Sequence, residues 1–140
     1  MKHHTKTKGD IGVGAVIADL LIKGITPCLP VSEHQEYDLV GCNEFGCKRI
    51  QVKARTISKQ GTLSVRSIAN WSDRFGCHRR FVDKSTFDLY AIYCLDNGEI
   101  YYLNPYEFDK AISIRVRPAK NNQSSLVRLA SDYTEYPKGP

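Results

Sequence analysis

Tyr37-Asp38-Leu39-Val40, followed by Ile50-Gln51-Val52-Lys53, is the part of the sequence that decides the fold. Each segment carries apolar residues in a pattern typical of a strand. The run 41–47 between them contains two glycines and an asparagine, which favour a turn. We therefore expect two antiparallel strands that bring Asp38 and Lys53 close together.

The polar residues of these two strands are typical of metal-dependent cleavage of phosphodiester bonds. A carboxylate such as Asp38 can hold Mg²⁺, while a lysine can orient or deprotonate a water and balance phosphate charge. The same spacing also occurs in strands whose polar residues merely face solvent. The basic strand that continues after Lys53 favours the catalytic interpretation.

Composition favours a single domain over residues 1–140 with an acidic partner. The chain has 140 residues, of which 41% are hydrophobic, and this suffices for a buried core. The net charge is +5 and the pI is near 9.0. This charge favours nucleic acid first and a membrane surface second. We expect no membrane role, because no amphipathic cationic helix is found in the sequence.

The cysteines, at positions 28, 42, 47, 77 and 94, are odd in number and irregularly spaced. The first residues are polar, so we expect no signal peptide, a cytoplasmic location and reduced thiols. The longest apolar stretch is interrupted by Asp19 and is too short to span a bilayer. A zinc site formed by Cys42, Cys47 and Cys77-His78 is a weaker alternative. Cys94 lies in an apolar run and is expected in the core.

Periodicity predicts a mixed α/β domain. A helix is expected over 9–23, where Gly12 and Gly14 indicate close packing of the helix backbone. Strands are expected at about 38–43, 47–56, 62–69, 87–95, 99–103 and 112–117, with a loop over 70–85 and short helices after Asn104 and over 123–132. Tyrosines 90, 93, 101, 102 and 106 are expected to pack a sheet rather than to stack bases.

The basic strand and loop at about 62–85 are the predicted DNA-binding region, because a two-stranded β-ribbon fits the major groove. The residues expected to reach base edges are Ser64, Arg66, Ser67 and Asn70. Those expected near phosphates are Arg74, His78, Arg79 and Arg80. Trp71 is expected to fill the core. The N-terminal residues Lys2, His3, His4, Lys6 and Lys8 suit either phosphate contacts or a solvated arm.

Further motifs occur in a specific order along the chain. They are Lys8-Gly9-Asp10, Val16-Ile17-Ala18-Asp19-Leu20, Pro30-Val31-Ser32-Glu33-His34, the two strands quoted above, Ala91-Ile92-Tyr93-Cys94 and Lys120-Asn121-Asn122-Gln123. Over nearly the whole chain the sequence resembles the group I intron-encoded homing endonucleases of the PD-(D/E)XK superfamily, in particular the cyanobacterial transfer-RNA-intron type. The resemblance implies a restriction-endonuclease-like core, with a central mixed β-sheet flanked by helices, and a homotetramer.

The same resemblance assigns roles to individual residues. Asp38 matches the metal-binding aspartate, Gln51 the usual acidic residue and Lys53 the motif lysine. Either the Gln51 side-chain oxygen or the Val52 carbonyl can then ligate a hard cation beside Asp38. Val13 stands near the position where the family usually carries a glutamate in its first helix. This possible loss of an acid predicts weakened or absent activity.

Taken together, the residues and the resemblance predict a site-specific, Mg²⁺-dependent endonuclease that cuts double-stranded DNA at a long, near-palindromic target. Because one subunit carries one site, cutting both strands needs at least a dimer. No small-molecule substrate is expected. Two alternatives stay open: a sequence-specific DNA-binding protein with impaired catalysis, and a structure-specific junction nuclease of the same fold.

Overall fold

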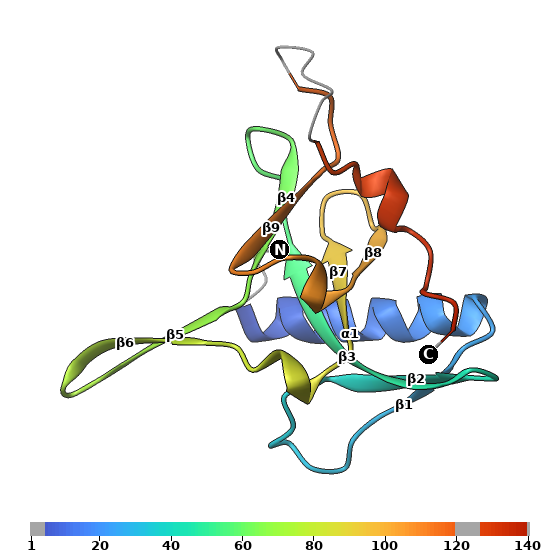
Figure 1. Cartoon of the computed structure of the whole chain (residues 1–140), viewed down its shortest axis with the longest axis horizontal. Coiled ribbons are helices and arrows are strands. Elements are labelled where there is room, and N and C mark those ends of the chain that lie inside the picture. The colour runs from blue at the N-terminus through green and yellow to red at the C-terminus, as the bar shows by residue number, and fades with distance from the viewer. Residues whose placement is uncertain (1–4, 120–126, 140) are drawn as a thin grey trace.

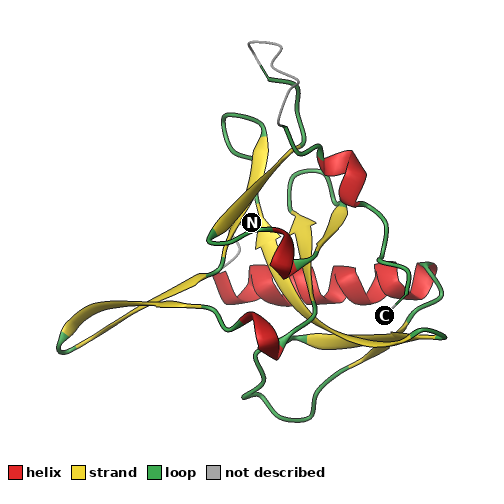
Figure 2. Ribbon diagram, in the orientation of Figure 1, coloured by secondary structure: helices red, strands yellow, loops and turns green. Residues whose placement is uncertain are grey.

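The computed structural model describes residues 5–119 and 127–139. One long helix, α1 (Thr5–Ile22), lies across one face of a central sheet (Figures 1 and 2). It begins four residues earlier than the sequence predicted. Gly12 allows the helix to approach the sheet closely, because a Cβ atom at this position would meet Val52 Cγ1 at 3.2 Å and the Ala54 Cβ at 3.4 Å. Gly14, in contrast, faces open space.

The central sheet has five strands in the order β1-β2-β3-β7-β8. Their bounds are β1 Thr26–Cys28, β2 Leu39–Asn43, β3 Gly46–Arg55, β7 Leu89–Cys94 and β8 Ile100–Leu103. The neighbours pair antiparallel except for β3 and β7, which are parallel. The predicted hairpin of β2 and β3 and the mixed sheet are therefore confirmed.

Two further antiparallel pairs lie outside the central sheet. Strand β4 (Thr62–Arg66) pairs with β9 (Ala111–Arg115), while β5 (Ile68–Asp73) pairs with β6 (Gly76–Phe81). The prediction of a loop over 70–85 is wrong, because most of it forms the β5–β6 hairpin. Figure 1 shows this hairpin, here called the ribbon, projecting from the body of the molecule.

The two faces of the central sheet carry different cores. One cluster lies beneath α1 and includes Val16, Leu20 and Ile50. The other lies between the central sheet and the β4–β9 pair and includes Leu63 and Tyr90. The second face is thus covered mainly by strands, together with the short 3-10 helices η2 (Pro105–Glu107) and η3 (Ala130–Tyr133).

The short 3-10 helices and the tyrosines mostly agree with the predictions from the sequence. Asn104 caps η2 by accepting a hydrogen bond from the Tyr106 N–H, with proline at the first position. The helix expected over 123–132 is described only in part: residues 120–126 lie outside the described chain, and η3 occupies its end. The tyrosines at 90, 101 and 102 are buried as expected, but Tyr106 is 66% exposed.

The cysteines correct one prediction. Cys42 and Cys47 lie directly opposite each other in the β2–β3 hairpin and form a disulfide, so reduced thiols were wrongly expected for this pair. Cys77 belongs to the ribbon, at the other end of the molecule in Figure 1. The described residues contain no group of three or more His, Cys, Asp or Glu side chains arranged for a metal ion, so the zinc alternative finds no support. Cys94 is buried as predicted.

None of the helices in the described ranges is long and apolar enough to cross a membrane.

Candidate functional site

Strand β3 presents a row of polar side chains where β2 no longer pairs with it. Alternate side chains of a strand point to opposite faces of the sheet. Ile50 and Val52 pack in the cluster beneath α1. Gln51, Lys53 and Arg55 therefore line the opposite face, and all three are half-buried. The β2–β3 ladder ends at the pair Leu39 and Ile50, which leaves this edge of β3 free of β2.

Asp38 lies at this free edge. Its N–H donates to the carbonyl of Ile50 at 2.9 Å, which extends the ladder by one bond. Its side chain then accepts a hydrogen bond at Oδ2 from the Val52 N–H at 2.7 Å. Two bonds of different kinds thus fix the carboxylate against the strand that carries Gln51 and Lys53. The predicted proximity of these residues is therefore what the structure shows.

Gln51 contributes an unusual feature. Its side-chain oxygen Oε1 is buried and has no hydrogen-bond partner among the described residues. Leaving a buried polar atom unpaired costs about 1–3 kcal/mol, so such atoms call for an explanation. The unpaired oxygen belongs to the residue next to Val52, whose N–H holds Asp38. This position suits the ligation of a hard cation.

The electrostatics of the row are set by burial. Asp38 as a residue is exposed, but its carboxyl group is desolvated enough to raise its pKa, against the opposing effects of the Val52 N–H and of Lys53. Burial likewise lowers the pKa of Lys53, and the charge of Arg55 lowers it further. Each effect disfavours the charged form of a group in the free protein. A bound cation near Asp38 and a bound phosphate near Lys53 would reverse both.

Arg55 belongs to this row although sequence reasoning passed it over. Its Nε donates to the Ser64 carbonyl at 3.3 Å, and its Nη1 donates to the Ala54 carbonyl at 2.9 Å. Burial lowers the pKa of its guanidinium. The signal available in the sequence was the alternation Gln51-Val52-Lys53-Ala54-Arg55, which places the three polar side chains on one face of a strand.

Val13, the residue at the expected position of an acid, lies in α1 directly after Gly12. It is half-buried and packs against the cluster beneath the helix. Its neighbour Gly12 is the point at which the helix approaches β3 at Val52 and Ala54. Asp10, three residues before Val13, is exposed.

The ribbon presents two different faces. Residues that pair across an antiparallel ladder share a face. Trp71 pairs with His78, their rings stack with centroids 5.2 Å apart, and His78 Nε2 lies 2.9 Å from Asp73 Oδ1. The expectation that Trp71 fills the core is wrong, because this side chain is 46% exposed. Asn70 pairs with Arg79 on the other face, and the side chain of Asn70 lies outside what the structure describes.

The other predicted DNA contacts are distributed along the ribbon and the second sheet. Arg74 lies at the ribbon tip over the ring of Phe75, 4.7 Å from its centroid. Arg80 is exposed and lies 3.7 Å from Glu36, in the segment that leads to Asp38. Ser64 and Arg66 are exposed on β4, where the Ser64 hydroxyl bonds that of Ser113 at 2.7 Å.

Ser67 departs from the prediction. It is 1% exposed, and its hydroxyl lies 3.3 Å from the hydroxyl of Tyr90. A buried side chain cannot read base edges, so Ser67 is corrected to a structural residue at the base of the ribbon. Tyr90 pairs with Gln51 in the β3–β7 ladder. The contact therefore attaches the ribbon at the level of the polar row.

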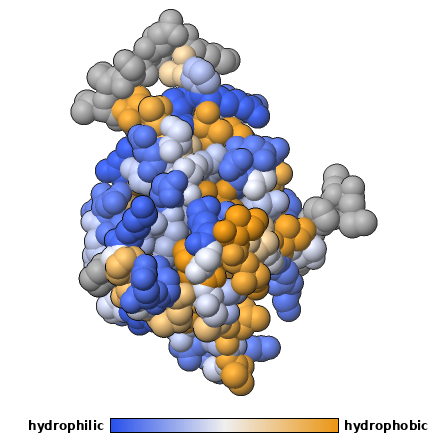
Figure 3. All heavy atoms as spheres, turned by 90° about the vertical axis from the view of Figure 1, so that its right-hand side faces the viewer, coloured by the Kyte–Doolittle hydropathy of each residue, from blue (hydrophilic) through white to orange (hydrophobic). Residues whose placement is uncertain are grey.

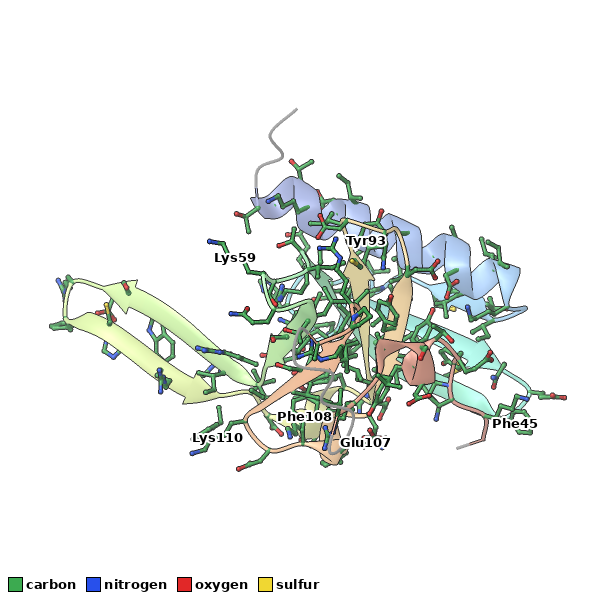
Figure 4. All side chains as sticks on the ribbon, turned by 90° about the horizontal axis from the view of Figure 1, so that it is seen from above. Phe45, Lys59, Tyr93, Glu107, Phe108 and Lys110 are labelled. Atoms are coloured by element: carbon green, nitrogen blue, oxygen red, sulfur yellow. A yellow bond between two sulfur atoms is a disulfide. The ribbon has the colours of Figure 1, made fainter. Side chains whose placement is uncertain are left out.

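One further basic residue lies at the base of the ribbon and was missed. Lys110, labelled in Figure 4, lies over the ring of Phe81, with its Nζ 5.8 Å from the ring centroid. Its carbonyl accepts a hydrogen bond from the Ser67 N–H. No sequence pattern around Lys110 links it with Ser67, more than forty positions earlier, so only the fold brings Lys110 to the base of the ribbon.

Comparisons with known proteins agree with this geometry. Residues 3–136 match the sequence profile of the family described as PD-(D/E)XK endonuclease. The fold is similar to the solved structure of a bacterial homing endonuclease, I-Ssp6803I, with a TM-score of 0.77 and 23% sequence identity over 94% of this chain and 88% of that chain. No curated protein matches the sequence significantly. The expected mixed α/β endonuclease core is thereby confirmed.

Proposed function

From the premise that this chain belongs to the PD-(D/E)XK endonuclease family, we propose that it is a site-specific endonuclease of double-stranded DNA that depends on Mg²⁺. The observation that carries the proposal is the buried Oε1 of Gln51, which has no partner among the described residues and belongs to the residue before Val52, whose N–H holds the Asp38 carboxylate. A cation at this position would give that oxygen a partner. The unpaired burial of this oxygen in the free protein is then explained by its role as a metal ligand.

The donor set fits a hard divalent cation. Mg²⁺ prefers oxygen ligands and is commonly bound through one or two carboxylates together with waters and substrate phosphates. Asp38 and Gln51 supply two side-chain oxygens. Both backbone groups of a strand residue point to the same side, so the Val52 carbonyl faces the free edge to which its N–H already points. When bound, the metal would polarise the scissile phosphate and activate a water.

Lys53 is proposed to act on the phosphate and the attacking water. It follows Gln51 by two positions and so lies on the same face. Its ammonium would stabilise the negative charge that develops on the phosphate oxygens during attack. No carboxylate in the described chain forms a salt bridge with Lys53, although the charge of nearby Asp38 acts on it, so its ammonium can still contact a phosphate.

The ribbon is proposed to lie in the major groove of the DNA. A two-stranded ribbon fits the major groove, where base edges can be read. Arg79 on one face and Arg80 on the other are exposed, as is Arg74 at the tip. Because Ser67 attaches the ribbon at the level of Gln51 through Tyr90, groove contacts and the scissile phosphate are held in a fixed relation.

Cutting both strands calls for a second copy of this chain, and the tetramer of the sequence prediction is one such assembly. Figure 3 shows apolar side chains gathered on the side of the molecule that carries the end of α1 and the β2–β3 hairpin. Large exposed apolar residues there are Leu21 at 60%, Ile22 at 83% and Phe45 at 53%. Burying them against their equivalents would be favourable. A cytoplasmic location belongs to the same proposal, because DNA is the proposed substrate.

A DNA-binding protein with impaired catalysis is the second candidate. It is favoured by Val13, which puts an apolar side chain where the family resemblance implies an acid. The ribbon and its arginines would be unaffected by this change, so binding would survive where cleavage is reduced.

Cleavage of a randomised duplex library, followed by sequencing of the ends, tests the proposal. The intact chain is incubated with Mg²⁺ or with chelator, beside Lys53→Ala and the control Lys59→Ala. Lys59 is exposed on the loop after β3 and extends away from the body in Figure 4. We expect Mg²⁺-dependent cuts at one near-palindromic site that persist in Lys59→Ala and disappear in Lys53→Ala. Cleavage that ignores sequence, or prefers four-way junctions, would contradict site-specific cutting, and cutting by Lys53→Ala would contradict the assigned chemistry.

A further inference from the structure

Arg55 lies at the end of the polar row on β3, two positions beyond Lys53 and on the same face. Its guanidinium is oriented by two backbone carbonyls, those of Ser64 and Ala54. These contacts use Nε and Nη1, which fixes the plane of the group. Since one contact reaches β4 and the other stays on β3, the side chain spans the gap between the catalytic strand and the second sheet.

Within residues 5–119 and 127–139, the charge of Arg55 has no acidic partner. Among the residues that the structure describes, no carboxylate forms a salt bridge with it or with Lys53. Both side chains are half-buried, and the charge of Arg55 disfavours that of Lys53, which Asp38 offsets only in part. Two carbonyl bonds satisfy donors of the guanidinium but leave its net charge uncompensated. An anion bound beside the pair would provide the compensation.

The spacing of the row indicates which anion. The Cα atoms of residues two apart on a strand are separated by about 6.8 Å. Adjacent phosphates along one DNA strand have a similar separation. We propose that Arg55 binds the backbone phosphate next to the scissile one, while Lys53 acts on the scissile phosphate itself. This inference rests on the proposed function, since it takes Lys53 as the residue at the cleaved bond. It adds a positioning residue that sets the direction of the DNA strand along β3.

A purely structural role is the competing account, because the two carbonyl bonds of Arg55 also join β3 to β4. Arg115 supplies a matched control for that role. It is half-buried and likewise donates to two backbone carbonyls, those of Gln60 at 2.8 Å and Arg117 at 3.2 Å. Arg115 belongs to β9 in the second sheet and not to the catalytic strand. Replacing either arginine by glutamine removes one charge and one carbonyl-bound guanidinium.

The test measures the salt dependence of DNA binding in chelator, so that no cleavage interferes. The probe is a fluorescent 20-base-pair duplex of random sequence, titrated with the intact chain, Arg55→Gln, Arg55→Lys and Arg115→Gln between 50 and 200 mM salt. One lost phosphate contact lowers the slope of log K against log salt by about 0.9. We expect this reduction for Arg55→Gln, little change for Arg115→Gln, and partial retention of the slope for Arg55→Lys. Thermal unfolding of the four proteins shows whether each variant is folded.

The outcomes separate this inference from the proposed function. Equal slopes for Arg55→Gln and the intact chain, or equal reductions for the two glutamine variants, would overturn the phosphate contact while leaving the nuclease untouched. An intact chain that binds with a steep salt slope but never cuts DNA would remove the catalytic proposal, and a reduced slope for Arg55→Gln would still support the contact. An intact chain without salt-dependent binding would overturn both.

Discussion

Val52 holds Asp38 in place through a hydrogen bond of 2.7 Å from its backbone N–H to Asp38 Oδ2, across fourteen residues of sequence. The bond lies just beyond the last pair of the β2–β3 ladder, Leu39 and Ile50. A carboxylate fixed by the backbone of the strand that carries Gln51 and Lys53 keeps its geometry without help from a flexible side chain. The site is thus organised before any ligand binds.

Asp38→Asn should remove the stabilisation that a divalent cation gives to this protein. At ten times its dissociation constant, a ligand that binds only the folded state stabilises by about 1.4 kcal/mol, which for this size of domain raises Tm by about 5 °C. Thermal unfolding with and without Mg²⁺ measures this directly. The intact chain should show the shift and Asp38→Asn should not, and an equal shift in both proteins would argue against Asp38 as a ligand.

The same variant has a predicted pH dependence without metal. Burial raises the pKa of Asp38 in the folded state, so its contribution favours folding below the unfolded-state pKa and is lost as pH rises through the folded-state pKa. Metal-free Asp38→Asn should therefore match or exceed the intact chain in Tm at pH 7.5. At pH 3 the Tm of the intact chain should rise relative to that of the variant. A lower Tm of the variant at pH 7.5 would contradict this sign.

Gln51→Leu should stabilise the metal-free protein and abolish cleavage. The substitution removes a buried oxygen that has no partner among the described residues, and such an atom costs about 1–3 kcal/mol. We expect a gain of about 1 kcal/mol in urea unfolding. Gln60→Leu, at an exposed turn position, is the control and should leave stability within about 0.5 kcal/mol of the intact chain. A destabilised Gln51→Leu would mean that the oxygen is paired in solution.

Val13→Glu should increase Mg²⁺-dependent cleavage by at least about tenfold, because a second carboxylate would strengthen cation binding. It should also cost about 1–2 kcal/mol of stability, since Val13 is half-buried against the core beneath α1. Val13→Gln serves as the matched control with the same size and no charge. If Val13→Gln gains as much activity, the effect does not come from an added acid.

Ser67→Ala should weaken folding by about 0.5–1.5 kcal/mol and leave the target sequence unchanged. The hydroxyl lies 3.3 Å from that of Tyr90 and is buried, so its loss affects only the attachment of the ribbon. A double-mutant cycle with Tyr90→Phe measures the coupling of the two groups. Sequencing of the cut ends gives the base preference, and an altered preference in Ser67→Ala would restore a base-reading role.

Local sequence patterns were sufficient for most of the central sheet. The alternation of Gln51, Lys53 and their apolar neighbours, and the Asn97-Gly98 turn between β7 and β8, specify strands and hairpins within short stretches. Strand β6 was missed because Gly76–Phe81 is rich in arginine and carries no apolar alternation. Its side chains are largely exposed, so the hydrophobic effect leaves no period in the sequence from which to recognise the strand.

The sequence by itself determined the mixed α/β class, the hairpin that brings Asp38 to Gln51 and Lys53, and the basic character of the ribbon, because each depends on residues close together in the chain. Tertiary structure alone decided that Ser67 is buried and that Arg55 bridges β3 and β4. These facts depend on which surfaces meet after the β4–β9 pair packs on the central sheet. Burial and pairing of that kind arise from contacts between distant segments, whose free energy no local pattern records.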